Sequence, residues 1–125
     1  MEETHLQQAK LWLIAAEHIS NLESKEKHTV SVALSIHSII KANDALTYKF
    51  LKTTAKRHDD ARRLFEDLIT NNFIKPEYSN YKQIIQDAIN NKAKAEYKGG
   101  FFSKKDSEIM IRKAQKFINM VKQEI

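Results

Sequence analysis

The middle of the chain carries the two side chains best suited to proton transfer, His37 and Asp44. They stand seven residues apart in a stretch with helical apolar spacing, residues 30–51, so on a helix they lie two turns apart on one face. A histidine with a carboxylate can act as an acid/base pair or orient a phosphate in a cleft between helices. The alternative is structural, with His37 hydrogen-bonded in the core and Asp44 accepting from a lysine or a backbone N–H. We favour this structural interpretation.

Positive charge is concentrated in two short segments. The net charge is +5, but residues 49–63 carry +4 and residues 92–105 carry another +4, which leaves −3 for the remainder. If the two segments meet in the fold, their cations form one groove for a phosphate backbone, and Tyr97, Phe101 and Phe102 could stack on bases. The candidate nucleic-acid-binding residues are Lys49, Lys52, Lys56, Arg57, Lys92, Lys94 and Lys98. The alternative is an ordinary solvated lysine surface.

Several other kinds of chemistry lack the residues that they need. The chain has no cysteine, which excludes disulfides, thiolate catalysis and cysteine-bound zinc. Its five histidines never stand three or four residues apart, and no glycine-rich phosphate loop or nucleophile elbow is present. We therefore expect no metal and no cofactor. The histidines are His5, His18, His28, His37 and His58.

The location of the protein is predicted from its apolar runs and its first residues. No apolar run approaches the roughly 20 residues that a membrane span needs. The chain begins with Met1, Glu2 and Glu3, acids where a signal peptide would carry basic residues. We expect a soluble, cytoplasmic protein that does not associate with membranes.

The elements that position these residues are predicted to be helices. Only two glycines and one proline occur, too few for the many tight turns of a β-sandwich. At 125 residues the chain is expected to form a single domain, 1–125. The spacing predicts an all-α, five-helix, mostly antiparallel up-and-down bundle. The helices are expected near residues 3–22, 30–51, 59–71, 79–97 and 104–125, with the second in the centre because it is apolar on more than one face.

The first predicted helix is apolar beyond a single stripe. Leu11, Trp12 and Ile14 widen its apolar surface, so it is expected to touch two neighbouring helices or a second subunit. Trp12 is interpreted as a core or interface residue rather than as a platform for a ligand.

The ends of the last two helices carry capping signals. Ser79 is predicted to cap the fourth helix, and Gly99-Gly100 to end it. Ser103 with Asp106 has the spacing of a capping box, preceded by Phe102 as a hydrophobic staple.

The order of these elements and three stretches resemble small HEPN-domain proteins. The stretches are IHSIIKANDAL, RHDDARRLFEDL and NKAKAEYKGGFFSKKDSEIMIRKAQKFINMV. In the last, Lys92, Ala95 and Tyr97 resemble an R-x-x-A-x-Y-type segment, and Ala114 and Phe117 an A-x-x-F ending. The resemblance covers residues 30–123 and implies a HEPN-like bundle that homodimerises. It also implies a possible partner of the minimal nucleotidyltransferase type.

The ribonuclease motif of catalytic HEPN proteins, R-x4-6-H, is absent. No histidine lies beyond His58, and the corresponding segment has Lys92 for the arginine and Tyr97 for the histidine. Lysine and tyrosine have ordinary pKa values near 10, so they are poor substitutes in metal-independent RNA cleavage. By analogy with the family, Asn43 and Asp44 are expected to face residues 92–97.

Three functions follow as hypotheses. The first is a non-catalytic, homodimeric HEPN-like module that binds RNA, a nucleotide or a nucleotidyltransferase-type partner through the basic groove. The second is a divergent metal-independent, toxin-like ribonuclease that uses Lys92, Tyr97, Asp44 and His37. The third is a structural or interaction bundle without a role in nucleic-acid binding.

Overall fold

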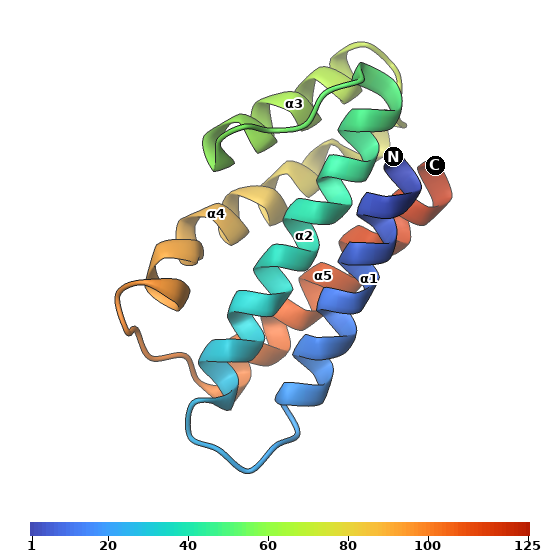
Figure 1. Ribbon diagram of the computed structural model, residues 1–125. Helices are drawn as coiled ribbons and strands as arrows, with labels where there is room; N and C mark the ends of the chain where they lie inside the picture. The colour runs from blue at the N-terminus through green and yellow to red at the C-terminus, as the bar shows by residue number, and fades with distance from the viewer.

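The computed structural model describes residues 1–125 and is entirely helical (Figure 1). It contains five α-helices, one short 3-10 helix and no strand, which confirms the all-α prediction. The α-helices are α1 (Glu2–Ile19), α2 (Lys27–Leu51), α3 (His58–Thr70), α4 (Lys82–Glu96) and α5 (Lys104–Glu124), and the 3-10 helix is η1 (Pro76–Tyr81). The helix that ends at Ile19 was predicted to reach residue 22, and α2 begins three residues earlier than predicted.

Helix α2 is the centre of the bundle, as its two apolar faces predict. It packs against each of the other four α-helices. Ile36, Ile39 and Leu46 are completely buried on it, and so are the small residues Ala42 and Ala45. A helix with neighbours around most of its circumference can hold only a narrow exposed face. Any polar residue on that face is therefore positioned between two neighbouring helices.

Helices α1 and α2 lie side by side and approach closely because small residues line their contact (Figure 1). Ala9 and Ala16 of α1 and Ser31 and Ser38 of α2 are all completely buried. The hydroxyl of Ser31 donates to the carbonyl of Ala16, and that of Ser38 donates to the carbonyl of Ala9, each at 2.8 Å. These bonds satisfy the buried hydroxyls and fix the register of the two helices.

Helix α3 buries one apolar face, and the start of α5 confirms its predicted cap. Ala61, Leu64, Phe65 and Leu68 are the buried residues of α3. At the start of α5, the Ser103 side chain accepts from the Asp106 N–H at 3.1 Å, and the Asp106 carboxylate accepts from the Ser103 N–H at 2.9 Å. These two reciprocal bonds make the capping box that the spacing predicted.

The prediction that Ser79 caps α4 is wrong. Ser79 lies inside η1, which starts at Pro76 and continues directly into α4. Proline suits the first turn of a helix because its fixed φ is already helical and it has no N–H to satisfy. It therefore starts this element three residues before the serine.

None of the six helices is both long enough and apolar enough to cross a membrane.

Candidate functional site: a histidine, a lysine and a glutamate where α2 meets α4

A three-residue polar cluster joins the middle of α2 to the end of α4. The Glu96 carboxylate lies between the other two side chains, with Oε1 2.5 Å from His37 Nε2 and Oε2 2.5 Å from Lys92 Nζ. Lys92 and Glu96 stand one turn apart on α4, a spacing that favours ion pairs, whereas His37 comes from the exposed face of α2. The cluster therefore depends on the packing of α2 against α4.

Trp12 of α1 covers the other side of His37. The two ring centroids are 5.1 Å apart and the ring planes are inclined at 28°, a stacked arrangement. The ring of Tyr97 lies at 6.0 Å from Lys92 Nζ, within the range of a weak cation–π contact, although Tyr97 itself is 77% exposed. His37 is thus held by an aromatic ring on one side and a carboxylate on the other.

Burial and the charge of Lys92 mainly determine how the pKa values of His37 and Glu96 are shifted. Partial burial and the nearby Lys92 charge lower the pKa of His37 below its ordinary value, and the carboxylate of Glu96 only partly opposes them. Burial tends to raise the pKa of Glu96, but the hydrogen bond from Lys92 and the adjacent charges outweigh it and leave this pKa lowered. At neutral pH the cluster therefore holds a neutral imidazole, a carboxylate and an ammonium.

These residues can do less chemistry than their types suggest. A neutral imidazole beside a carboxylate can accept a proton, as a general base requires. The ammonium of Lys92, however, is already neutralised by Glu96, and Lys92 is only 8% exposed. A phosphate would have to compete with Glu96 for this cation. The cluster is thus internally compensated, and its structural role accounts for most of its contacts.

His37 differs from its predicted role as a core residue. Its side chain is 37% exposed, and it stands on the exposed face of α2 between Trp12 and Glu96. The sequence interpretation missed this because residues at i, i+4 and i+7 share a face but do not reveal which face is covered.

The expectation that Asn43 and Asp44 face residues 92–97 is wrong as well. The Asn43 amide donates to the carbonyl of Ala61 in α3 at 3.1 Å. The groups that act on Asp44 are Lys41 and the backbone of Ala55, in the loop after α2. No hydrogen bond or ion pair joins either residue to 92–97, and the α2 side chain that meets this segment is His37.

Asp44 is the most perturbed acid of the chain. Burial raises its pKa from 3.8 to about 6, although Lys41 and the Ala55 backbone favour the charged form. Its Oδ1 atom has no hydrogen-bond partner. A buried carboxylate without full hydrogen bonding lowers the stability of the folded protein.

The seven candidate nucleic-acid-binding cations have different surroundings. Lys92 is buried in its ion pair, Lys49 donates to the carbonyl of Ile125, and Lys94 lies 4.5 Å from the ring centroid of Phe102. The exposed cations without a carboxylate partner are Lys52, Lys56, Arg57, Lys94 and Lys98. The structure therefore removes Lys92 and Lys49 from the set of open cations and leaves the other five at the surface.

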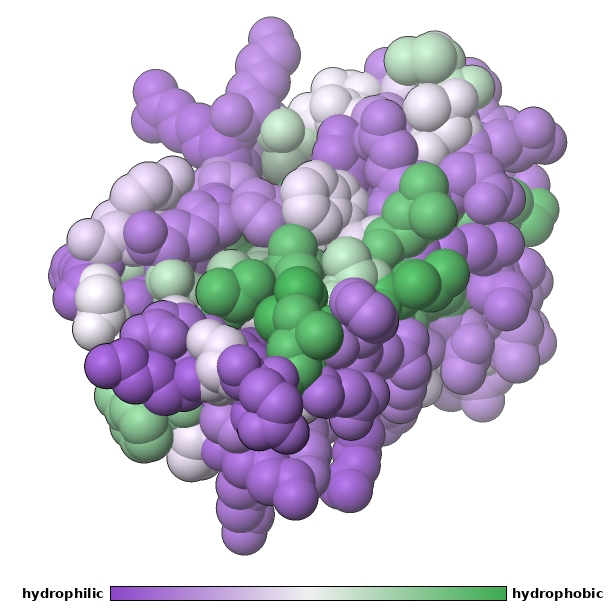
Figure 2. Space-filling view, turned by 60° about the horizontal axis from the view of Figure 1, so that its bottom comes forward, coloured by the Kyte–Doolittle hydropathy of each residue, from purple (hydrophilic) through white to green (hydrophobic).

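An apolar surface borders the cluster, and we name it the α1–α2 face. Its residues are Leu11, Trp12 and Ala15, which line one groove together with Gln8 and Lys41. Leu11 and Ala15 stand one turn apart on α1, and Trp12 stacks on His37 of α2. Leu11 is 65% exposed. Figure 2 shows hydrophobic residues gathered in one area of the surface, with hydrophilic residues around it.

Comparisons of the chain with family models, with curated proteins and with solved structures found no match. Within the structure, no three histidine or acidic side chains come together as a metal site would require.

Two partners in the cluster were missed by sequence reasoning. Glu96 was counted only as a charge, although its spacing of four from Lys92 is a readable signal for an ion pair. Trp12 was expected in the core or at an interface, but nothing in its own helix indicates a stack on His37. Such a contact between α1 and α2 depends on the register set by the buried serines.

Proposed function

We propose that the protein is a HEPN-like, mostly antiparallel up-and-down helical module that forms a homodimer through the α1–α2 face. The observation that carries the proposal is the exposure of Leu11 and Trp12, which line one groove of a chain whose net charge is +5. Exposed apolar areas with a polar rim mark sites of association. The resemblance to HEPN proteins implies a homodimer independently.

A second copy is the occupant that this face suits best. A twofold symmetric interface brings each patch against itself, so a patch rich in like charges would repel its copy. Lys41 is the only charged residue that lines the groove with Leu11, Trp12 and Ala15. Burial of Leu11 and Trp12 from both copies supplies the apolar centre that homodimer interfaces favour.

Light scattering during gel filtration tests this proposal. The wild-type protein is expected to run at twice the mass of one chain, and Leu11→Glu at the mass of one chain, because two copies of the new carboxylate would be buried together. Ile14→Glu is the matched control, since Ile14 is similarly exposed, at 60%, but does not belong to the α1–α2 face. A wild-type monomer, or equal effects of both substitutions, would overturn the proposal.

The dimer is further proposed to bind RNA weakly through its exposed cations. Lys52, Lys56 and Arg57 follow the end of α2, and Lys98 follows the end of α4. Binding through such contacts falls steeply as salt increases. A gel-shift series should show binding at about 50 mM salt that is lost near 200 mM, and it should be weaker in Lys56→Gln/Arg57→Gln. No shift at the lower salt concentration would exclude this part, as would equal binding by the variant.

A second candidate function is a divergent ribonuclease, which the contact of His37 with Glu96 favours. In this scheme His37 replaces the missing histidine of α4 as the general base, and Lys92 stabilises the phosphorane after Glu96 moves away. Incubation with structured and unstructured RNA should give products with the wild type and none with His37→Gln or with Lys92→Ala/Tyr97→Phe. Equal products from all three preparations would reject this candidate.

A further inference from the structure

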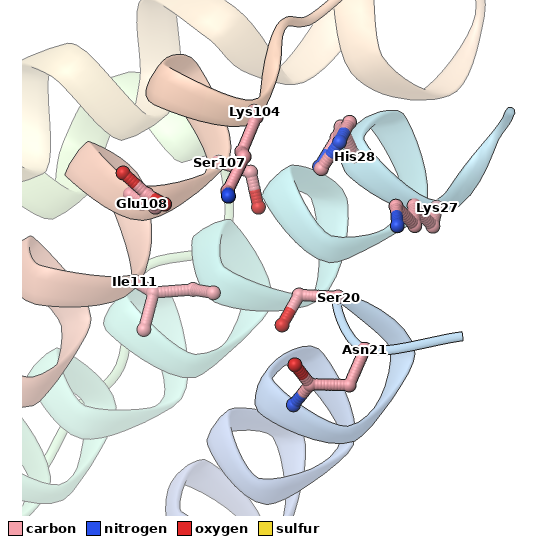
Figure 3. Close-up of a pocket in the computed structure, with 8 residues that line it drawn as sticks. All are labelled: Ser20, Asn21, Lys27, His28, Lys104, Ser107, Glu108 and Ile111. Carbon is pink, nitrogen blue, oxygen red and sulfur yellow. The ribbon is translucent and has the colours of Figure 1, made fainter. Parts of the chain in front are cut away.

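A polar cavity lies where α1 ends and where α2 and α5 begin (Figure 3). Its volume is about 250 Å³. That is smaller than the pockets of roughly 300–1,000 Å³ that hold drug-sized molecules. The lining residues are Ser20, Asn21, Lys27, His28, Lys104, Ser107, Glu108 and Ile111. Only one of them, Ile111, is hydrophobic, so the cavity suits a small polar group.

The hydroxyl of Ser107 lacks a partner. Ser107 is only 1% exposed, and its Oγ atom makes no hydrogen bond. Buried hydroxyls in native proteins almost always have one. By contrast, the hydroxyls of Ser31, Ser35 and Ser38 all donate to backbone carbonyls. Figure 3 shows the Ser107 hydroxyl directed into the space between α5 and the first turn of α2. This unpaired hydroxyl points to a ligand.

Two helix N-termini border the same cavity. Helix α2 has no side-chain cap and no acid in its first turn, and the N–H groups of His28 and Thr29 donate to no acceptor. At α5 the capping box uses the N–H groups of Ser103 and Asp106, which leaves the N–H of Lys104 without an acceptor. Free N–H groups and the positive end of the helix dipole both favour an anion.

The side-chain charges of the cavity favour an anion, as the free backbone N–H groups do. Lys27 and Lys104 form no ion pair, in contrast to Lys92 and Lys113. Lysines at the first turn of a helix are unfavourable unless an anion compensates them. The single acid, Glu108, lies on the far side of Lys104 from His28 in the view of Figure 3. The cavity is therefore positive overall.

We propose that this cavity binds a phosphate group, either inorganic phosphate or the terminal phosphate of a nucleotide. The oxygens of the phosphate accept hydrogen bonds from the Ser107 hydroxyl and from the free N–H groups of α2. The ammonium groups of Lys27 and Lys104 neutralise its charge. A compact, multiply charged acceptor matches the size of the cavity and its several donors better than a monovalent anion does. The cavity shares no lining residue with the groove of the α1–α2 face, and the proposed phosphate does not require the proposed dimer.

Titration with inorganic phosphate, followed by amide NMR at constant ionic strength, tests the proposal. Saturable shifts are expected at Ser107, His28 and Thr29. Ser107→Ala and Lys27→Gln/Lys104→Gln should each weaken the affinity by about tenfold or more, because charge-assisted hydrogen bonds are lost. Lys105→Gln is the matched control, since Lys105 neighbours Lys104 on α5 but does not line the cavity. It should change the affinity less than about twofold.

Two further titrations distinguish free phosphate from the phosphate of a nucleotide. A nucleoside 5′-monophosphate that binds more tightly than inorganic phosphate supports a nucleotide, and equal binding supports free phosphate. The matching nucleoside without phosphate should cause no shift at these amides, and equal shifts with it would overturn the proposal. Shifts that chloride reproduces at the same ionic strength, or equal affinities for the wild type, Ser107→Ala and the double lysine variant, would overturn it as well.

Discussion

Two polar clusters touch α2, and they differ in how their charges are compensated. Around His37, the carboxylate of Glu96 contacts both the imidazole and the Lys92 ammonium, and Trp12 covers the ring. In the cavity at the start of α2, Lys27 and Lys104 have no acidic partner and the Ser107 hydroxyl has no acceptor. The first cluster resembles a catalytic site by residue type, but the opposite charges of Glu96 and Lys92 compensate one another. The second lacks any motif, but its groups are free to bind a ligand.

Residue type is therefore a weaker guide to function than the hydrogen bonds and ion pairs that each group makes or lacks. Histidine, lysine and glutamate together suggest catalysis, but a lysine that is 8% exposed and paired contributes first to the packing of α4. A serine and two lysines suggest a plain surface, but their lack of partners is costly unless something binds there. Both inferences can be tested by breaking the pairs or by removing the free groups.

The largest effect is expected from Glu96→Gln. The substitution leaves the buried Lys92 ammonium without its carboxylate, and loss of one partner of a buried pair is strongly destabilising. Urea denaturation should show a loss of about 3 kcal/mol in the free energy of unfolding. Glu108→Gln, which removes an acid without an ion pair, should change it by less than about 0.5 kcal/mol. Equal changes in the free energy of unfolding for both variants would show that Glu96 does not stabilise the buried Lys92 ammonium.

The next effect is a gain in stability from Asp44→Asn. The pKa of Asp44 is about 6 in the folded protein and near 3.8 when unfolded, so the folded state binds more protons between these values and loses stability as the pH rises through them. At pH 7.5 the amide should therefore be more stable than wild type by about 2 kcal/mol.

The difference between Asp44→Asn and wild type should disappear at about pH 2, well below both pKa values, where the carboxyl is protonated in both states. Denaturation curves at the two pH values measure it, with Asp59→Asn as an exposed control. A gain that persists unchanged at low pH would contradict burial of a charge as the cause.

A smaller effect concerns the titration of His37. Its pKa is lowered by burial and by Lys92, so its NMR titration midpoint should lie below 6.5. Lys92→Gln should raise that midpoint, since a nearby positive charge is removed. Because the folded pKa is below the unfolded one, His37 costs stability as the pH falls below 6.5 toward the folded value. A midpoint at or above 6.5 would place the imidazole in a different charge state from the one described.

The smallest effect is expected at the open cavity. Lys104→Gln removes a positive charge from the first turn of α5, where it opposes the helix dipole. In buffer without phosphate the variant should be more stable than wild type by about 0.5 kcal/mol, and added phosphate should stabilise the wild type more than the variant. Thermal unfolding with and without phosphate measures both. A loss of stability in phosphate-free buffer would mean that Lys104 already has a favourable partner.

Patterns local to one helix could be predicted from the sequence, and contacts between helices could not. The capping box at Ser103 and the helix expected near residues 59–71 depend on neighbours within a few residues, and both are observed. The start of α4 was missed because Pro76 begins η1 ahead of Ser79. The contact of His37 with Glu96 joins residues far apart in the chain, so its prediction would need the register of α2 against α4.

The central claim, a homodimer through the α1–α2 face, is tested most directly by the only tryptophan of the chain. Trp12 is 38% exposed in one copy and lies on the proposed interface. Acrylamide quenching of its fluorescence, measured over a dilution series, should be weak at high protein concentration and become stronger as the dimer dissociates. Leu11→Glu should be quenched strongly at every concentration. If quenching of the wild type equals that of Leu11→Glu throughout the series, Trp12 is not buried by a second copy and the claim is wrong.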